Sequence, residues 1–179
     1  METVIARITD ETFGEESKEF NNPKIRKGAR GIVQREDGKI AIFCKKNKNE
    51  YKLPGGGIDE GEEPEIAFRR EVKEEAGCEI TDIKLLGKTE ELKSLDNFQQ
   101  ISYVFTARVT SIQENLNLTQ KEIDEGGCLL WMTPEEALEK ITNCAEQIVA
   151  SQYENAYHSK FINYRDREIL KYFLKTYNK

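Results

Sequence analysis

Residues 54–77 read PGGGIDEGEEPEIAFRREVKEEAG and constrain the fold more than any other stretch of the chain. Three consecutive glycines come first. Pro64 and Gly77 then stand where proline favours the first position of a helix and glycine favours its end. We therefore predict a short helix over residues 64–76, directly after a glycine loop. Most of this helix is charged, and its few apolar side chains, such as Phe68 and Val72, point away from its acidic positions.

The acidic side chains of this predicted helix share one face. Residues three and four apart on a helix are neighbours, so Glu71, Glu74 and Glu75 converge. Two carboxylates about 6 Å apart repel each other by roughly 3 kcal/mol at an effective dielectric constant near 20. Carboxylates at this density suit Mg²⁺ or Mn²⁺, which bind hard oxygen ligands. Taken alone, the same pattern also fits an ordinary solvated helix face.

The residues around the acidic face add to the metal interpretation. Without Cβ atoms, Gly55, Gly56 and Gly57 can turn sharply and bring backbone amides and carbonyls close to a ligand. Arg70 carries a fixed fork of donors that can orient a neighbouring carboxylate. Glycine runs by themselves mostly form loops, so the hypothesis depends on the combination.

The rest of the chain predicts a mixed sheet. The run ARGIVQREDGKIAIFCKK at residues 29–46 is typical of a hairpin around Asp37-Gly38, where both central positions can take positive φ. Further strands are expected at residues 3–8, 83–90 and 99–109, and a short apolar run follows at residues 128–132. A helix is expected from Thr133, with Leu138, Ile141, Ala145, Ile148 and Val149 as its buried stripe, and a last helix over residues 165–177. This order favours an α/β fold of the α+β kind, in which helices cover both faces of the sheet.

Length and composition restrict the possible classes of protein. The 179 residues suit one domain, and we divide them into an extension of a strand and a loop (1–23) and a single domain (24–179). A net charge of −6 offers no basic field for duplex nucleic acid. No apolar run approaches the roughly 20 residues of a membrane span, and the first residues lack a signal peptide pattern. We expect a cytoplasmic protein.

The four cysteines show no metal-binding pattern. Cys44, Cys78, Cys128 and Cys144 lie far apart, without CxxC or CxxH spacing. We therefore predict small buried apolar side chains, with neither a zinc site nor a disulfide framework.

The stretch from the glycine loop to Gly77 resembles the signature of the Nudix hydrolases. That signature runs Gly, five residues, Glu, seven residues, Arg-Glu, an aliphatic residue, any residue, Glu-Glu, any residue, Gly and an aliphatic residue. The matching positions are Gly56, Glu62, Arg70, Glu71, Val72, Glu74, Glu75 and Gly77. Cys78 replaces the final aliphatic residue, and a cysteine can serve there as a small hydrophobe. With its surroundings, the resemblance covers residues 26–141.

The resemblance implies a fold, a reaction and a set of site residues. The fold is a mixed sheet sandwiched between helices (α/β/α), and the reaction is metal-dependent cleavage of a diphosphate linkage in a nucleoside diphosphate derivative. The implied metal ligands are Glu71, Glu74, Glu75 and a carbonyl of Gly55 or Gly56. Glu62 supports them, Arg70 orients them and Gly55, Gly56 and Gly57 contact substrate. The general base is one of the motif glutamates or a carboxylate of the later loop, for which Glu122, Asp124 and Glu125 are candidates. Family members are frequently homodimers.

Substrate choice lies outside the signature. Relatives that act on ADP-ribose or dinucleoside polyphosphates tend to carry a proline or a tyrosine about sixteen to eighteen residues further on, where this chain has Ser94 and Asp96. We therefore favour nucleoside triphosphates, including oxidised ones, or nucleotide sugars. A non-catalytic nucleotide sensor on the same fold is the alternative. The aromatic segment holding Tyr153, Tyr157, His158, Phe161 and Tyr164 either stacks a base or packs the last helix onto the body.

Overall fold

The computed structural model describes residues 3–113, 116–145 and 156–177. Its strands are β1 (Val4–Ile8), β2 (Lys24–Gln34), β3 (Ile40–Lys45), β4 (Glu50–Lys52), β5 (Gly55–Gly57), β6 (Cys78–Lys93), β7 (Phe98–Ile112) and β8 (Gly127–Met132). Its helices are α1 (Pro64–Ala76), α2 (Gln120–Asp124), α3 (Pro134–Ala145) and α4 (Ala156–Tyr177). Short 3-10 helices occupy Asp10–Phe13, Lys46–Lys48 and Ser94–Asp96.

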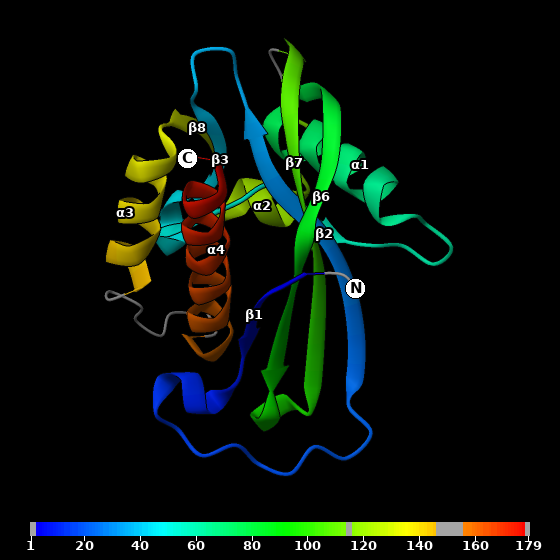
Figure 1. Cartoon of the computed structure of the whole chain (residues 1–179), viewed down its shortest axis with the longest axis vertical. Coiled ribbons are helices and arrows are strands. Elements are labelled where there is room, and N and C mark those ends of the chain that lie inside the picture. Colours follow the sequence, from blue (N-terminus) through cyan, green and yellow to red (C-terminus); the bar gives the residue numbers. More distant parts are fainter. Residues whose placement is uncertain (1–2, 114–115, 146–155, 178–179) are drawn as a thin grey trace.

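Eight strands of the described ranges form one mixed sheet. The strand order is β1-β6-β7-β2-β3-β4, with β5 added to β2 and β8 added to β3. The pairs β1–β6 and β2–β7 are parallel, and the other strand pairs of the described ranges are antiparallel. Helix α1 lies on one side of the sheet, and α3 and α4 lie on the other (Figure 1). The predicted α/β/α arrangement is confirmed.

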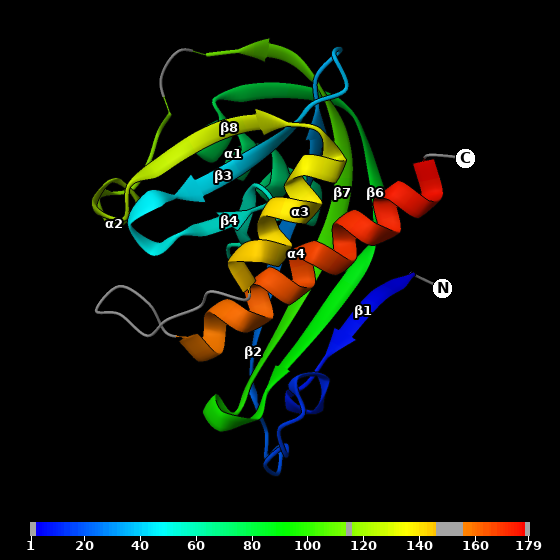
Figure 2. The ribbon, with the colours of Figure 1, turned by 90° about the vertical axis from the view of Figure 1, so that its left-hand side faces the viewer.

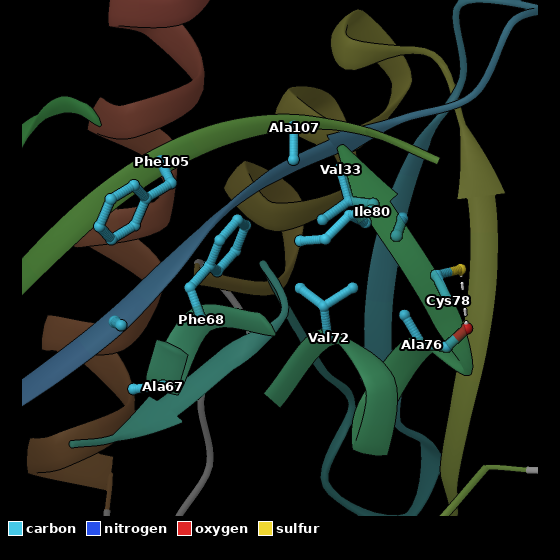
Figure 3. Close-up of a cluster of buried hydrophobic side chains, with 11 residues drawn as sticks. Val33, Ala67, Phe68, Val72, Ala76, Cys78, Ile80, Phe105 and Ala107 are labelled. Carbon is cyan, nitrogen blue, oxygen red and sulfur yellow. Dashed lines mark hydrogen bonds between the residues drawn. The ribbon is translucent and has the colours of Figure 1, made fainter. Parts of the chain in front are cut away.

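Each face of the sheet has its own apolar core. Under α1, Phe68 stacks on Phe105 with ring centroids 5.2 Å apart, and Val72 packs beside them (Figure 3). On the opposite face, Ile169 and Leu170 of α4 are fully buried with residues of α3 and of the central strands. Helix α4 crosses this face diagonally, with α3 beside it (Figure 2). The charged face of α1 is thereby left for another role.

The helix and hairpin predictions agree closely with the structure. Helix α1 spans the predicted residues, and Gly77 ends it with φ 58° and an N–H that donates to the Lys73 carbonyl at 3.1 Å. Strands β2 and β3 form the predicted hairpin around Asp37-Gly38. Only Gly38 takes a positive φ (82°) there. Asp37 instead accepts a hydrogen bond from the Lys39 amide at 3.2 Å.

Several elements are longer than predicted. Strands β6 and β7 extend beyond residues 83–90 and 99–109, and their register shifts where Asp82 and Gly87 have positive φ. Such irregularities interrupt the alternation of polar and apolar residues that reveals a strand in sequence. Helix α4 begins at Ala156 rather than near residue 165. Tyr153, Ile148 and Val149 lie outside the described residues.

The cysteine prediction is wrong for one pair. Cys44 and Cys128 stand directly opposite each other on β3 and β8 and form a disulfide. The sequence could not show this, because the two residues are 84 positions apart and only sheet pairing brings them together. Cys78 and Cys144 are free and buried, as predicted.

The N-terminal residues pack against the rest of the chain. Strand β1 pairs with β6 at the edge of the sheet. The Phe13 ring lies 5.0 Å from that of Phe161 and 5.5 Å from that of Tyr164, so these aromatic residues hold α4 in place. Across the described residues, no helix combines the length and apolar character that a bilayer span requires.

Candidate active site

The glycine loop lies directly against the acidic face of α1. Strand β5 consists of Gly55, Gly56 and Gly57, and pairs with β2. A Cβ atom built on Gly56 would lie 2.5 Å from the carboxylate atoms of Glu71, so no other residue fits there without movement. Gly55 has a φ of 144° and would clash with β2 if it carried a side chain. The glycines therefore allow the loop to lie directly against α1 and β2.

Glu75 is the most deeply placed of the three helix glutamates. It is 3% exposed. Its Oε2 accepts a hydrogen bond from the Gly55 amide at 2.8 Å, and its Oε1 accepts one from Lys52 Nζ at 2.7 Å. The carboxylate thus joins the helix to the loop and carries a lysine as its counterion.

Arg70 connects the loop, the helix and Glu62. Its Nε and Nη2 donate to the two oxygens of Glu62 at 3.0 and 2.9 Å, and its Nη1 donates to Glu71 Oε1 at 2.8 Å. Nη2 also donates to the Gly57 carbonyl at 2.9 Å. The hydrogen bonds to Glu62, and then those to Glu71, raise the pKa of Arg70. The orienting role predicted for Arg70 has a matching geometry.

The remaining two motif glutamates differ in their exposure. Burial raises the pKa of Glu71 above its usual value, although the bond from Arg70 opposes that shift. Glu74 has a side chain that is 37% exposed and lies 3.6 Å from Arg70 Nη1. Glu74 is therefore the motif carboxylate most open to solvent. For Glu71, by contrast, burial disfavours the charged form.

The donor set fits a divalent cation. Within the described ranges, no three His, Cys, Asp or Glu side chains are grouped closely enough to hold a metal ion as they stand. Lys52 and Arg70 occupy the oxygens of Glu75 and Glu71 instead. Lys52 Nζ is also 3.5 Å from the Gly55 carbonyl oxygen. A carboxylate oxygen of Glu75 and this carbonyl oxygen therefore face the same cation. Glu71, Glu74, Glu75 and the Gly55 carbonyl could hold Mg²⁺ or Mn²⁺, which prefer such ligands.

The two loop carbonyls proposed as ligands face different ways. The Gly56 oxygen lies 2.8 Å from the position that a Cβ on Gly28 would take, so it points towards β2. The Gly55 oxygen faces Lys52 and, through it, Glu75. Gly55 is the better candidate of the pair.

The later acidic loop contributes two of its three predicted carboxylates to the same cleft. Glu125 is 2% exposed and lies 2.7 Å from Lys45 Nζ and 3.8 Å from Lys48 Nζ. Burial favours its neutral form, but Lys45 outweighs that effect and the pKa of Glu125 is lowered. Glu122 caps α2 by accepting from the amide and hydroxyl of Thr119 at 2.9 and 2.8 Å. Asp124 does not line the cleft and accepts a hydrogen bond from Gln120.

These groups line one cleft of about 670 Å³. Among the lining residues that the structure describes, nine are basic and six are acidic, which is unexpected in a chain of net charge −6. The basic residues are Arg26, Arg30, Lys45, Lys48, Lys52, Arg70, Lys93, Lys121 and Arg165. Sequence reasoning found only Arg70 among them, because the others come from seven separate elements. His158 also lines the cleft and pairs with Asp96.

Comparison with known proteins agrees with this geometry. A family model of the NUDIX domain matches residues 24–152. The chain belongs to the NUDIX domain family. The predicted resemblance is thus confirmed, and the match contains the glycine loop, α1 and the loop of Glu125.

Three relatives of this NUDIX protein illustrate the range of similar chains. An RNA pyrophosphohydrolase of Caulobacter vibrioides is 35% identical over 75 residues, which are 40% of this chain and 42% of the relative. Diphosphoinositol polyphosphate phosphohydrolase 3-alpha of Mus musculus is 30% identical over 121 residues, or 68% and 70% of the two chains. A MutT-like protein of Streptomyces ambofaciens is 27% identical over 111 residues, or 62% and 66%. The match thus spans about two fifths of the RNA pyrophosphohydrolase.

Proposed function

We propose that the protein hydrolyses a diphosphate linkage in a nucleoside diphosphate or triphosphate derivative, with Mg²⁺ or Mn²⁺ as cofactor. One observation carries the proposal: the buried carboxylate of Glu75 is bonded to the glycine loop, beside Glu71, in a cleft lined by nine basic residues. Carboxylates suit a metal, and the surrounding cations suit phosphoryl oxygens. The names of two relatives, an RNA pyrophosphohydrolase and a diphosphoinositol polyphosphate phosphohydrolase, support this class of reaction.

The chain's own residues divide the work. Glu71, Glu74, Glu75 and the Gly55 carbonyl would hold the cation, which shields the diphosphate charge and makes a nearby water a better nucleophile. Glu62 fixes the guanidinium of Arg70, and Arg70 in turn positions Glu71. Lys52 faces Glu75 and can turn its charge to a phosphoryl oxygen when a cation takes its place.

We propose Glu125 as the residue that accepts the proton of the attacking water. It lines the cleft, and its lowered pKa keeps it deprotonated at neutral pH. Lys45 fixes its position through an ion pair at 2.7 Å. Glu122 is a weaker choice, because one of its oxygens caps α2.

A substrate panel tests this function. The purified protein is incubated with nucleoside triphosphates, including oxidised ones, nucleotide sugars and ADP-ribose, with Mg²⁺ or with EDTA. We expect phosphate-containing products from at least one substrate class in Mg²⁺ only. Metal-dependent binding without turnover would instead support the nucleotide sensor. Homodimer formation and a cytoplasmic location remain predictions.

A further inference from the structure

Two arginines on the floor of the cleft have no carboxylate partner. Arg26 and Arg30 are four residues apart on β2, so they point to the same face of the sheet. Neither forms an ion pair with any other residue that the structure describes. Arg30 is 6% exposed, and its Nε has no hydrogen-bond partner there. Leaving a buried charged donor unpaired is costly, so this arrangement calls for an anion from outside the chain.

Glu91, Asp166 and Glu75 attract Arg30, but none of them forms an ion pair with it. Glu91 lies 3.1 Å from Arg165 and 3.0 Å from Lys93, and Asp166 lies 2.8 Å from Arg165. The two buried carboxylates, Glu91 and Asp166, are thus already paired with two other cations, Arg165 and Lys93. Burial, followed by repulsion from Arg165, lowers the pKa of Arg30 to about 10, so Arg30 still carries its charge at neutral pH.

The free donors converge over a pair of glycines. Gly28 of β2 and Gly57 of β5 are paired across the two strands. A Cβ on Gly57 would lie 2.8 Å from Arg26 Nη2. A Cβ atom on Gly28 would lie 2.8 Å from Gln100 Nε2 and 3.4 Å from the Nη2 atom of Arg30. Two guanidinium groups and an amide therefore lie close over the two glycines, at positions that side chains there would block.

We propose that Arg26, Arg30 and Gln100 form a subsite for a third phosphoryl group. This subsite lies next to the glutamate site, the proposed cation site of Glu71, Glu74 and Glu75, which would engage the two phosphoryl groups of the cleaved diphosphate. The inference rests on the proposed function and narrows its substrate class. Gly57 directly follows Gly56, which touches Glu71, so the subsite continues the line of the glutamate site along β5. Guanidinium groups match the geometry of phosphate oxygens. A nucleoside triphosphate supplies a third phosphoryl group, whereas a nucleotide sugar does not.

Equilibrium binding of two matched probes tests the subsite. ATP and ADP are titrated calorimetrically into the full-length protein in EDTA, where no turnover complicates the measurement. We expect ATP to bind at least tenfold more tightly than ADP. Arg26→Gln and Arg30→Gln should each lower the affinity for ATP by about tenfold or more and remove most of its advantage over ADP. Arg108→Gln, on an exposed position of β7 outside the cleft, is the control and should leave the ratio unchanged.

Two results would overturn the subsite. Equal binding of ATP and ADP by the wild type would show that no third phosphoryl group is held. Equal losses for both probes in the arginine variants would show that these residues hold the part that the probes share. Because Arg26 is exposed, its substitution tests the proposal even if Arg30→Gln fails to fold. Failure of hydrolysis in Mg²⁺ with this binding pattern intact would count against the proposed function alone.

Discussion

Glu91 offers a sharp test of how the floor of the cleft is held together. Its side chain is fully buried and lies between Arg165 (3.1 Å) and Lys93 (3.0 Å), with Arg30 nearby. Burial disfavours its charge, but the cations, Arg165 foremost, outweigh this and lower the pKa of Glu91 from 4.5 to about 2. That difference corresponds to roughly 3 kcal/mol of stability, in the range expected when one partner of a buried ion pair is removed.

We therefore expect Glu91→Gln to lower the free energy of unfolding by about 3 kcal/mol at pH 7, measured by urea denaturation followed by circular dichroism. Glu90→Gln is the matched control. Glu90 directly precedes Glu91 on β6 and pairs with Lys88 near the surface at 3.2 Å, so its loss should cost about 1 kcal/mol or less.

The pH dependence gives an independent check with a definite sign. A carboxylate with a lowered pKa in the folded state stabilises the protein above its unfolded pKa and loses that effect as pH falls. The stability gap between wild type and Glu91→Gln should therefore be full above pH 4.5 and shrink as the pH approaches about 2. A gap under about 1 kcal/mol at pH 7, or one that widens with acid, would refute the reasoning.

Three further predictions concern the site and the disulfide. Arg70→Lys keeps a charge but loses the fork that binds Glu62, so kcat/KM should fall by about tenfold or more with an unchanged circular dichroism spectrum; wild-type kinetics would argue against its positioning role. Glu125→Gln should reduce kcat and remove the acid limb of the pH profile, which we place below the ordinary glutamate range; an unchanged profile would reassign the base. Alkylation of the denatured, unreduced protein should label two of the four cysteines, leaving Cys44 and Cys128 unmodified, whereas labelling of all four would exclude the disulfide.

Local chemistry made much of the fold predictable from sequence. Pro64 and Gly77 fix the ends of α1 through effects that act within one turn of the helix, and the prediction needed no tertiary information. The glycine run and the acidic face were likewise visible because their meaning depends on short spacing. Their direct contact with each other, of Gly55 with Glu75 and of Gly56 with Glu71, was not part of the prediction.

Features that depend on tertiary contacts were not predictable. Arg30 reads as one residue of a strand, and its isolation in the cleft follows only when β5, β7 and α4 enclose it. Glu91 and Lys93 look like solvated positions of a charged strand, yet α4 buries them with Arg165. Cys44 and Cys128 meet through strand pairing across 84 residues. In each case the decisive partner lies far away in sequence, beyond the reach of periodicity or motif spacing.

The central claim is that the acidic face of α1 serves metal-dependent hydrolysis. It is tested most directly by the Mg²⁺-dependent rate of nucleoside triphosphate hydrolysis in Glu74→Gln. Glu74 is 37% exposed at its side chain, so the fold should survive its substitution. Glu65→Gln, at an exposed position on the first turn of the same helix, is the control. We predict a loss of about 100-fold or more in kcat/KM for Glu74→Gln and less than about twofold for Glu65→Gln. Near wild-type rates in Glu74→Gln, or hydrolysis that persists in EDTA, would contradict the account.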